Sequence, residues 1–325
     1  HSHHSCSLAV TLVPAHGPST EALKKNATIA LNYANLHGHT TSQFYDEDLN
    51  RSSQARLQLE NDLRHVLERD ELELYYQPKV DLASGRVKSL EALVRWHHPE
   101  LGMIPPEEFI SMAEETGLIT SIGYSILESA CQQVKRWHAA GYRDISIAVN
   151  LSAVQFSQPD LLKRILNTLI TSGISPRQLE LEITESTIMH DLDAAAATMR
   201  ALHCSGICIS IDDFGTGYSS LNHLKRFPIK TVKIDRSFIR DITTDPDDKA
   251  IVSAIISMAH GMGLNVVAEG VETVEQLNIL RALQCNEIQG FLFSPPVTAE
   301  EATVLLDQHI DSRLQPVTAC QVVNS

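Results

Sequence analysis

Two adjacent aspartates, Asp212 and Asp213, stand at the end of an apolar run in the segment SIDDFGTGYSS and are followed at once by Gly-Thr-Gly. Neighbouring side chains of a strand point to opposite faces, so this pair can serve one site only where the strand ends and its backbone turns. Taken alone, the segment is equally compatible with an Asp-rich turn that uses glycines for positive φ. The pair therefore indicates a site at a strand mouth if the surrounding residues support one.

Further oxygen-bearing side chains lie in or at the ends of other apolar runs, and the whole set is Glu91, Asn150, Glu182, Asp212, Asp213 and Glu269. Carboxylate and amide oxygens without histidine or thiolate select hard cations, so Mg²⁺ or Mn²⁺ is favoured over zinc. Five carboxylates exceed what one Mg²⁺ needs, and an Asp-Asp pair can bridge one ion and reach a second. Two ions about 3.5–4 Å apart are the usual arrangement for phosphodiester hydrolysis.

Two cations complete the candidate chemistry. Lys233 could orient the nucleophile or offset charge in the transition state, and Arg95 could hold a phosphate through two hydrogen bonds. Each residue taken singly is more often structural, as a buried ion pair, a cation over an aromatic ring or a strand-end cap. Oxygen ligands from six strand positions together reverse that preference. Glu180 shares the inward parity of Glu182 and is assigned no role.

The elements that must position these residues are short β-type runs alternating with helical patterns. The runs cover residues 72–80, 88–96, 145–152, 179–184, 207–212, 230–235, 264–269 and 287–293. This alternation predicts a (β/α)8 barrel of the TIM type, with a doubly wound open sheet as the alternative. Only DLASGR separates the first two runs, which is too short for a helical crossover. We therefore expect an antiparallel first strand, and a mouth at which the ends of the other strands meet.

The chain divides into four segments by pattern. Residues 1–47 run from a strand-like stretch through a turn to a helix and resemble part of an α+β domain. Residues 48–70 carry apolar side chains at roughly helical spacing, which predicts a connecting helix that docks on the barrel. Residues 71–312 form the predicted barrel, and residues 313–325 have no periodic signal and are expected to be a tail.

Composition limits the partners and the compartment. The formal net charge is -14, from 40 acidic and 26 basic residues, which argues against binding to polymeric nucleic acid. We find no membrane span or signal peptide, so we expect no membrane contact within this chain. The 6 cysteines are scattered rather than dense, which favours a reducing cytoplasm. We expect a cytoplasmic protein whose full-length form could be tethered to a membrane elsewhere.

Long ordered motifs between residues 70 and 308 resemble those of EAL-domain cyclic di-GMP phosphodiesterases. They include YYQPKVDLASGRVKSLEALVRWHHPELG, LELEITES, IDDFGTGYSSLNHLKRFPIKTVKIDRSFI, VVAEGVET and CNEIQGFLFSPP. The resemblance implies a barrel with one antiparallel strand. It also implies metal-dependent hydrolysis of cyclic di-GMP to linear pGpG, the reaction of a cyclic-guanylate-specific phosphodiesterase in bacterial signalling.

The same resemblance assigns roles to matching positions. One metal ion would be held by Glu91, Asn150, Glu182 and Asp212, and the second by Asp212, Asp213 and Glu269. Lys233 would contact the catalytic water, for which Glu269 is a proposed base, so that Lys233, Glu269 and Glu91 form the predicted catalytic set. The dinucleotide would be contacted by Gln77, Arg95 and Gln289. Glu185 would brace the loop after the fifth strand, and Glu272 would support the seventh strand. Independently of the resemblance, Gly215 and Gly217 are expected to give that loop room to move.

Three further expectations follow from the resemblance. Residues 1–47 resemble the closing segment of a GGDEF domain, although the chain contains no Gly-Gly pair and hence no cyclase signature loop, and we expect a longer parent protein. A homodimer is expected, formed near the loop after the fifth strand and its following helix. The alternative to an active enzyme is a catalytically silent receptor that binds cyclic di-GMP.

Overall fold

The structure is a computed structural model that describes residues 8–13, 19–36, 42–189, 191–217 and 224–310. The predicted tail at 313–325 and part of the loop after Gly217 lie outside the described residues. The chain separates into two compact units, His1–Arg69 and Asp70–Ser325, and each is described by itself.

The N-terminal unit contains β1 (Leu8–Val10), α1 (Thr20–Leu36), β2 (Ser42–Phe44) and α2 (Glu47–Leu63). Strands β1 and β2 pair in parallel, as two strands joined through a helix must do, and Ala30 and Tyr45 form a small core. The connecting helix predicted to reach residue 70 ends earlier, at Leu63. Beyond it the backbone N–H groups of His65 and Val66 bond three residues back, so the chain tightens into turns.

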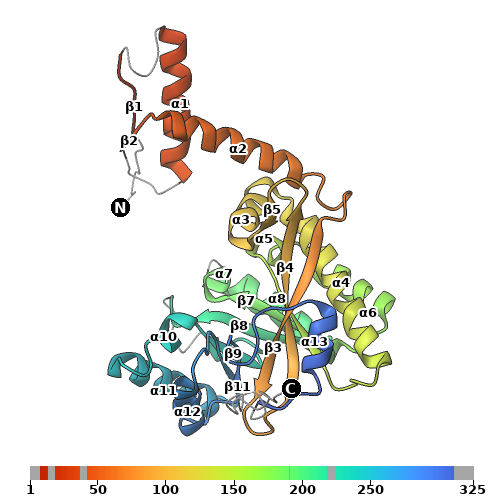
Figure 1. The fold of residues 1–325 in the computed structure, drawn as a ribbon. Helices are drawn as coiled ribbons and strands as arrows, with labels where there is room; N and C mark the ends of the chain where they lie inside the picture. Colours follow the sequence, from red (N-terminus) through yellow and green to blue (C-terminus); the bar gives the residue numbers. More distant parts are fainter. Residues whose placement is uncertain (1–7, 14–18, 37–41, 190, 218–223, 311–325) are drawn as a thin grey trace, which may run out of the picture. The chain divides into compact units, whose positions relative to one another are not determined.

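The second unit is a closed barrel (Figure 1). Its strands are β3 (Leu72–Asp81), β4 (Val87–His98), β6 (Ser146–Asn150), β7 (Leu179–Thr184), β8 (Cys208–Phe214), β9 (Thr231–Ile234), β10 (Asn265–Ala268) and β11 (Glu287–Ile288). They follow the order β3-β11-β10-β9-β8-β7-β6-β4, β3 also pairs with β4, and β5 (Gly102–Ile104) extends β4. The closed sheet confirms the (β/α)8 prediction over the doubly wound alternative. Because β3 is antiparallel to both neighbours, the inverted first strand is also confirmed.

Helices surround the strands (Figure 1). They are α3 (Pro106–Thr116), α4 (Ile119–Ala139), α5 (Ala153–Phe156), α6 (Leu161–Ser172), the 3₁₀ turn η1 (Pro176–Gln178), α7 (Glu185–Met189), α8 (Leu192–Cys204), α10 (Arg236–Arg240), α11 (Pro246–Gly261), α12 (Val274–Ala282) and α13 (Ala299–Leu305). Their starts carry expected signals: α11 has Pro246 in its first turn and Asp245 as an N-cap that accepts from Asp247 N. Within the described residues, no helix combines the length and apolarity needed to cross a bilayer.

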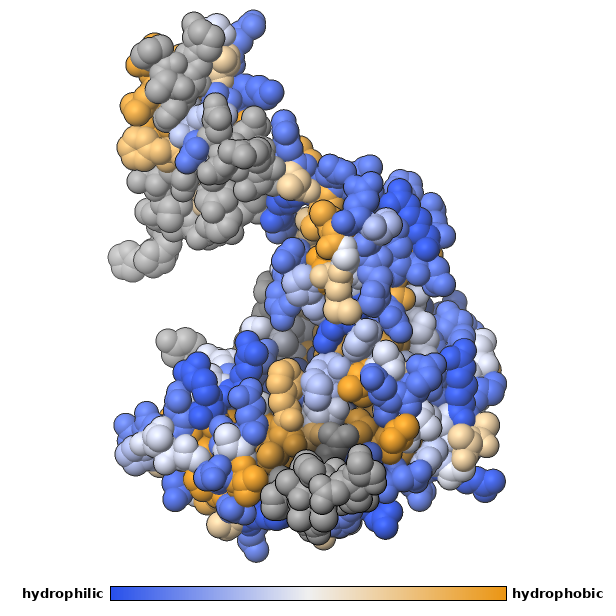
Figure 2. All heavy atoms as spheres, viewed as in Figure 1, coloured by the Kyte–Doolittle hydropathy of each residue, from blue (hydrophilic) through white to orange (hydrophobic). Residues whose placement is uncertain are grey.

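Alternation along the strands separates an apolar outer layer from a polar interior. In β7, Leu179, Leu181 and Ile183 are fully buried in the main hydrophobic core, whereas Glu180 and Glu182 occupy the other face. The surface in Figure 2 is mainly hydrophilic over the described residues of the barrel. Carboxylates inside the barrel are therefore exceptions to the general burial pattern and need compensating charges.

Strand β11 is shorter than predicted. It ends at Ile288, so Gln289 lies directly after the strand rather than within it. A Cβ on Gly290 would lie 2.2 Å from the carbonyl oxygen of Val271, so the backbones approach too closely for any other residue. The chain then turns, with Phe293 N bonding to Gly290 O, which ends the strand.

Candidate active site

A bulge, rather than the end of a strand, brings the adjacent aspartates to one site. Strand β8 continues through Phe214, and its pairing with β9 shifts between Ile211 and Phe214. Asp213 adopts a positive φ of 54°, and its backbone N–H donates to Asp212 Oδ1 at 3.0 Å. The prediction that the strand ends at residue 212 is therefore wrong in detail, because the extra residue of the bulge turns the backbone inside the strand.

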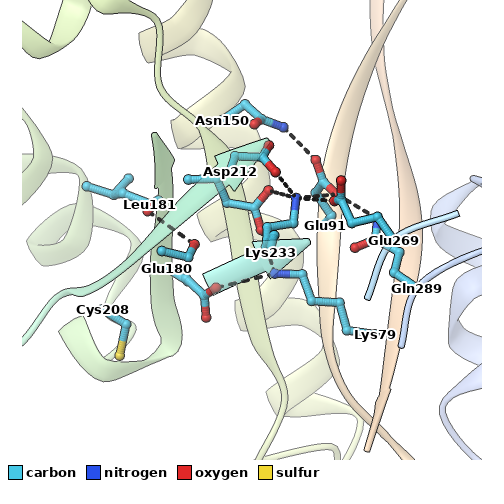
Figure 3. Close-up of polar contacts among 12 residues, drawn as sticks. Lys79, Glu91, Asn150, Glu180, Leu181, Cys208, Asp212, Lys233, Glu269 and Gln289 are labelled. Carbon is cyan, nitrogen blue, oxygen red and sulfur yellow. Dashed lines mark hydrogen bonds and ion pairs between the residues drawn. The ribbon is translucent and has the colours of Figure 1, made fainter. Parts of the chain in front are cut away.

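Lys233 lies at the centre of the strand ends. Its ammonium nitrogen is 2.5 Å from Glu182 Oε2, 2.6 Å from Glu269 Oε1, 3.1 Å from Asp212 Oδ1 and 3.4 Å from Glu91 Oε2. Figure 3 shows this nitrogen surrounded by side chains that come from different strands. Lys233 is 1% exposed, so these contacts act in a poorly screened interior. The predicted carboxylates from separate strands are thus brought together around one cation.

The protonation of the cluster is uneven. Burial raises the pKa of Glu91 and Asp212, with repulsion from Glu182 adding to both, and burial followed by the neighbouring Asp235 raises the pKa of Asp213. Burial also raises the pKa of Glu269, to about 8. Burial thus disfavours the ionised form of these four carboxylates, although each of Glu91, Asp212 and Glu269 contacts Lys233.

Glu182 is the exception among these carboxylates. Burial opposes its ionisation, but the ammonium groups of Lys233 and Lys79 more than offset that penalty and hold its pKa at about 2. Burial likewise disfavours the charged form of Lys233, yet the surrounding carboxylates, Glu182 first, raise its pKa well above the ordinary value. Glu182 and Lys233 are therefore a fixed ion pair inside the cluster.

Three carboxylates offer a candidate metal site. Oxygens of Asp212, Asp213 and Glu269 all lie within 4.8 Å of one another. Asn150 joins the same cluster through its Nδ2, which donates to Glu91 Oε1 at 2.6 Å. The ligand atoms that these side chains offer to a metal are all oxygens, and the carboxylates among them carry excess negative charge. This ligand set fits a hard divalent cation.

Two glutamines predicted to contact substrate lie beside the carboxylates. Gln289 Nε2 donates to Glu91 Oε2 at 2.6 Å and to Gln77 Oε1 at 2.9 Å, and Gln77 Nε2 donates to Ser294 O at 3.2 Å. Gln289 Oε1 is buried without a hydrogen-bond partner among the described residues. This amide therefore offers an acceptor next to the acidic cluster.

Arg95 makes its contacts outside this cluster. Its guanidinium carbon lies 5.6 Å from the centre of the Tyr75 ring, and Nη1 donates to Val94 O at 2.8 Å. Glu272 is also outside the cluster: its backbone N–H donates to Gln276 Oε1, and it lines a separate cavity of about 530 Å³ with Arg236 and Arg240. The structure thus brings together the predicted metal ligands, Lys233, Gln77 and Gln289, but neither Arg95 nor Glu272.

The loop after β8 is tied to the start of α7. Glu185 is buried, and its Oε2 accepts from Gly215 N at 3.2 Å. Gly215 has φ of 102°, and a Cβ on Gly217 would lie 2.5 Å from Glu185 Oε1. The positive φ of Gly215 therefore favours glycine there, whereas a side chain at residue 217 would displace the Glu185 carboxylate.

A second buried lysine, Lys79, was not identified from the sequence. Its ammonium nitrogen lies 2.5 Å from Glu182 Oε1 and 3.3 Å from Glu180 Oε1. One sequence signal could have identified it: Lys79 follows Gln77 by two residues, so the two side chains share one face of β3. Glu180, to which no role was assigned from the sequence, pairs with this lysine.

Comparisons with known proteins agree on one family. Residues 60–296 match the EAL domain. The chain is 46% identical over 297 residues to the bifunctional diguanylate cyclase/cyclic di-GMP phosphodiesterase MucR of Pseudomonas aeruginosa. It is 42% identical over 293 residues to the cyclic di-GMP phosphodiesterase NbdA of the same species.

A solved structure, PaMucR phosphodiesterase in complex with c-di-GMP, matches with a TM-score of 0.74 and 49% identity, covering 75% of this chain and 99% of that chain. The two curated relatives are longer proteins. The alignments cover 91% and 90% of this chain but only 43% of MucR and 37% of NbdA, so the chain spans less than half the length of either.

Proposed function

The chain belongs to the EAL-domain family, and on that basis we propose that it hydrolyses one phosphodiester bond of cyclic di-GMP to give linear pGpG. The observation that carries the proposal is the contact of Lys233 with four carboxylates from separate strands, all of which belong to the predicted metal ligand set. A related structure that contains c-di-GMP and shares 49% identity supports the substrate class.

The metal ligands follow from the donor set. Glu91, Asn150, Glu182 and Asp212 would hold one Mg²⁺ or Mn²⁺ ion, and Asp212, Asp213 and Glu269 would hold a second. Such ions would lower the pKa of a water molecule and stabilise charge on the phosphate oxygens. The raised pKa values of Asp212, Asp213 and Glu269 agree with this assignment, because a bound cation would favour the ionised form that burial disfavours.

The chain's own residues provide the remaining functions. The Lys233 ammonium group donates hydrogen bonds at the centre of the site, where it would orient the attacking water and offset developing negative charge. Glu269, whose Oε1 lies 2.6 Å from Lys233 Nζ, would accept the proton of the attacking water once the cations hold it ionised. Gln77 and Gln289 would bind the dinucleotide through amide groups, with Arg95 further out on β4.

A direct assay tests the proposal. We expect the chain with cyclic di-GMP and Mg²⁺ or Mn²⁺ to form a linear dinucleotide, detected by chromatography. Asp212→Asn keeps the size of the side chain but removes a charge shared by both proposed ions, so metal binding and turnover should fall together, by at least about 100-fold in turnover. No product from the unaltered chain in either metal would rule out the enzyme. Tight cyclic di-GMP binding in chelator with no turnover would establish the receptor alternative.

Two broader assignments belong to the same proposal. We infer that residues 1–47 are the end of a GGDEF-type domain, supported by the β1–α1–β2 unit and by alignment to a bifunctional cyclase/phosphodiesterase over 91% of this chain. We also propose a cytoplasmic homodimer, which light scattering of the purified chain would test.

A further inference from the structure

Glu182 differs from every other carboxylate of the described site in the number of lysines that it contacts. Glu91, Asp212 and Glu269 meet Lys233 alone, whereas Glu182 meets Lys233 through Oε2 and Lys79 through Oε1, each at 2.5 Å. Glu182 and Lys79 are each 1% exposed. Both oxygens of this carboxylate therefore accept a hydrogen bond, each from a different lysine.

The inverted first strand places Lys79 on the inner side of the cluster. Gln77 of β3 lies at the level of the site, where it contacts Gln289, and Lys79 follows it by one two-residue step of about 6.6–6.8 Å along the strand. Strand β3 is antiparallel to β7. Moving two residues forward along β3, from Gln77 to Lys79, therefore corresponds to moving two residues back along β7, from Glu182 to Glu180. In Figure 3 the Lys79 nitrogen lies apart from Lys233 and next to Glu180.

We propose that Lys79, held by Glu180, is a positioning residue that fixes Glu182 Oε1 and thereby leaves Glu182 Oε2, the oxygen that faces Lys233, as the single ligand oxygen for the metal. The inference rests on the proposed metal-dependent function and extends it to two residues outside the ligand set. The three donors of an ammonium group allow Lys79 to bond both glutamates at once.

The pairing has a physical reason. A carboxylate free to rotate could bind a cation through one oxygen or both, and the ordering of that side chain would reduce the metal affinity. Lys79 removes this freedom before any cation arrives, because Oε1 is already bonded. Groups that hold a metal ligand from behind in this way typically change metal affinity by about 10–100-fold when removed. Glu180 balances the charge of Lys79, so the Lys79–Glu180 pair adds no net charge to the site.

Calorimetric titration with Mn²⁺ in the absence of nucleotide tests the role of Lys79. The test variant combines Lys79→Met with Glu180→Gln, which removes one charge of each sign from the interior and so avoids an unpaired buried charge. We expect its Mn²⁺ dissociation constant to rise at least about tenfold while its melting transition in chelator stays cooperative. Lys88→Met is the matched control, because Lys88 is an exposed lysine that pairs with the buried Asp81 on the same hairpin, and its Mn²⁺ affinity should equal that of the unaltered chain.

A folded double variant that binds Mn²⁺ within about twofold of the unaltered chain would overturn the proposal, since outer partners of true ligands have larger effects. The readout is binding rather than turnover. A chain that binds Mn²⁺ but leaves cyclic di-GMP intact would therefore contradict the proposed hydrolysis and still decide the role of Lys79.

A second measurement uses the unaltered chain and does not depend on a variant that folds. The ¹⁵N signal of the Lys79 ammonium group should persist on addition of Mg²⁺, because its bonds to Glu180 and Glu182 Oε1 remain. The Lys233 signal should shift as its carboxylate partners bind the cation. Loss of the Lys79 signal on Mg²⁺ addition would show that Lys79 releases Glu182, which contradicts a positioning role.

Discussion

Glu182 and Glu269 belong to one buried cluster, yet the structure sets their pKa values on opposite sides of the usual range. Burial is the largest influence on both groups and favours the protonated form. Two lysines overcome that effect at Glu182 and bring its pKa to about 2. Glu269 meets Lys233 but also the charges of Asp212 and Glu91, and its pKa is about 8. The second lysine at Glu182 and the neighbouring carboxylates at Glu269 account for the difference between these two pKa values.

This difference predicts how stability depends on pH in the metal-free protein. A glutamate in an unfolded chain titrates near about 4.3, whereas Glu269 titrates at about 8 in the folded chain. Between these values the folded state binds more protons, so its free energy of unfolding decreases as pH rises through the window. We expect the melting temperature in chelator to fall between about pH 5 and pH 8, and Glu269→Gln to reduce that slope.

Saturating Mn²⁺ provides the control for the pH experiment. Bound cations keep Glu269 ionised, so the Glu269-dependent part of the slope should disappear, and binding should release protons that calorimetry in buffers of different ionisation enthalpy can count. A melting profile with the same slope in the unaltered chain and in Glu269→Gln would show that another group governs the pH dependence.

At the scale of single elements, local patterns predicted the strands but not their irregularities. Alternating residues gave the boundaries of β7 at 179–184, and the short DLASGR connection gave the inverted β3. The bulge at Asp212–Asp213 depends on the register of β8 against β9, and the early end of β11 depends on contact between Gly290 and Val271. Such features arise from tertiary contacts, so a local sequence pattern does not contain them.

The site shows the same division between local and distant information. The oxygen ligands could be predicted because each lies in, or at the end of, its own apolar run. The Lys79–Glu180 pair joins β3 to β7, and the two residues are 101 positions apart in the sequence. The two-residue spacing of Lys79 from Gln77 shows only which face it shares, and the closed barrel is needed to show that this face meets Glu180. Arg95 shared a face with Glu91, but it packs on Tyr75 because β4 continues beyond the level of the carboxylates.

The loop after β8 makes a prediction at the same scale. Gly215 has φ of 102°, and a Cβ there would lie 2.9 Å from Phe238 Cε2. Gly215→Ala should therefore lower the free energy of unfolding by at least about 1–2 kcal/mol, since an L side chain is strained at positive φ. Mn²⁺ binding should also weaken, because relief of the strain would move the backbone of residue 215, whose N–H bonds to Glu185 and which follows Asp213 by two residues. Denaturant unfolding and calorimetry measure the two effects.

Gly261→Ala is the matched control for this loop. Gly261 lies in α11, where a Cβ would meet nothing within 4 Å. An alanine at a compatible position should be neutral or stabilise by about 0.4–1 kcal/mol. Equal effects of the two substitutions would contradict a specific requirement for glycine at residue 215.

At the scale of the whole molecule, the proposed chemistry is confined to one of the two units. Every proposed ligand and substrate contact lies between Gln77 and Gln289, within the unit Asp70–Ser325, and the family match begins at residue 60.

A fragment of residues 60–325 also keeps Leu63 and Val66, each 1% exposed. We expect it to bind Mn²⁺ and hydrolyse cyclic di-GMP with a kcat/KM within about twofold of the longer chain, because a compact unit with its own core folds alone. Asp212→Asn in the fragment should abolish turnover as it does in the longer chain. A fragment that melts cooperatively and binds Mn²⁺ but has lost turnover would show that residues 1–59 contribute to activity.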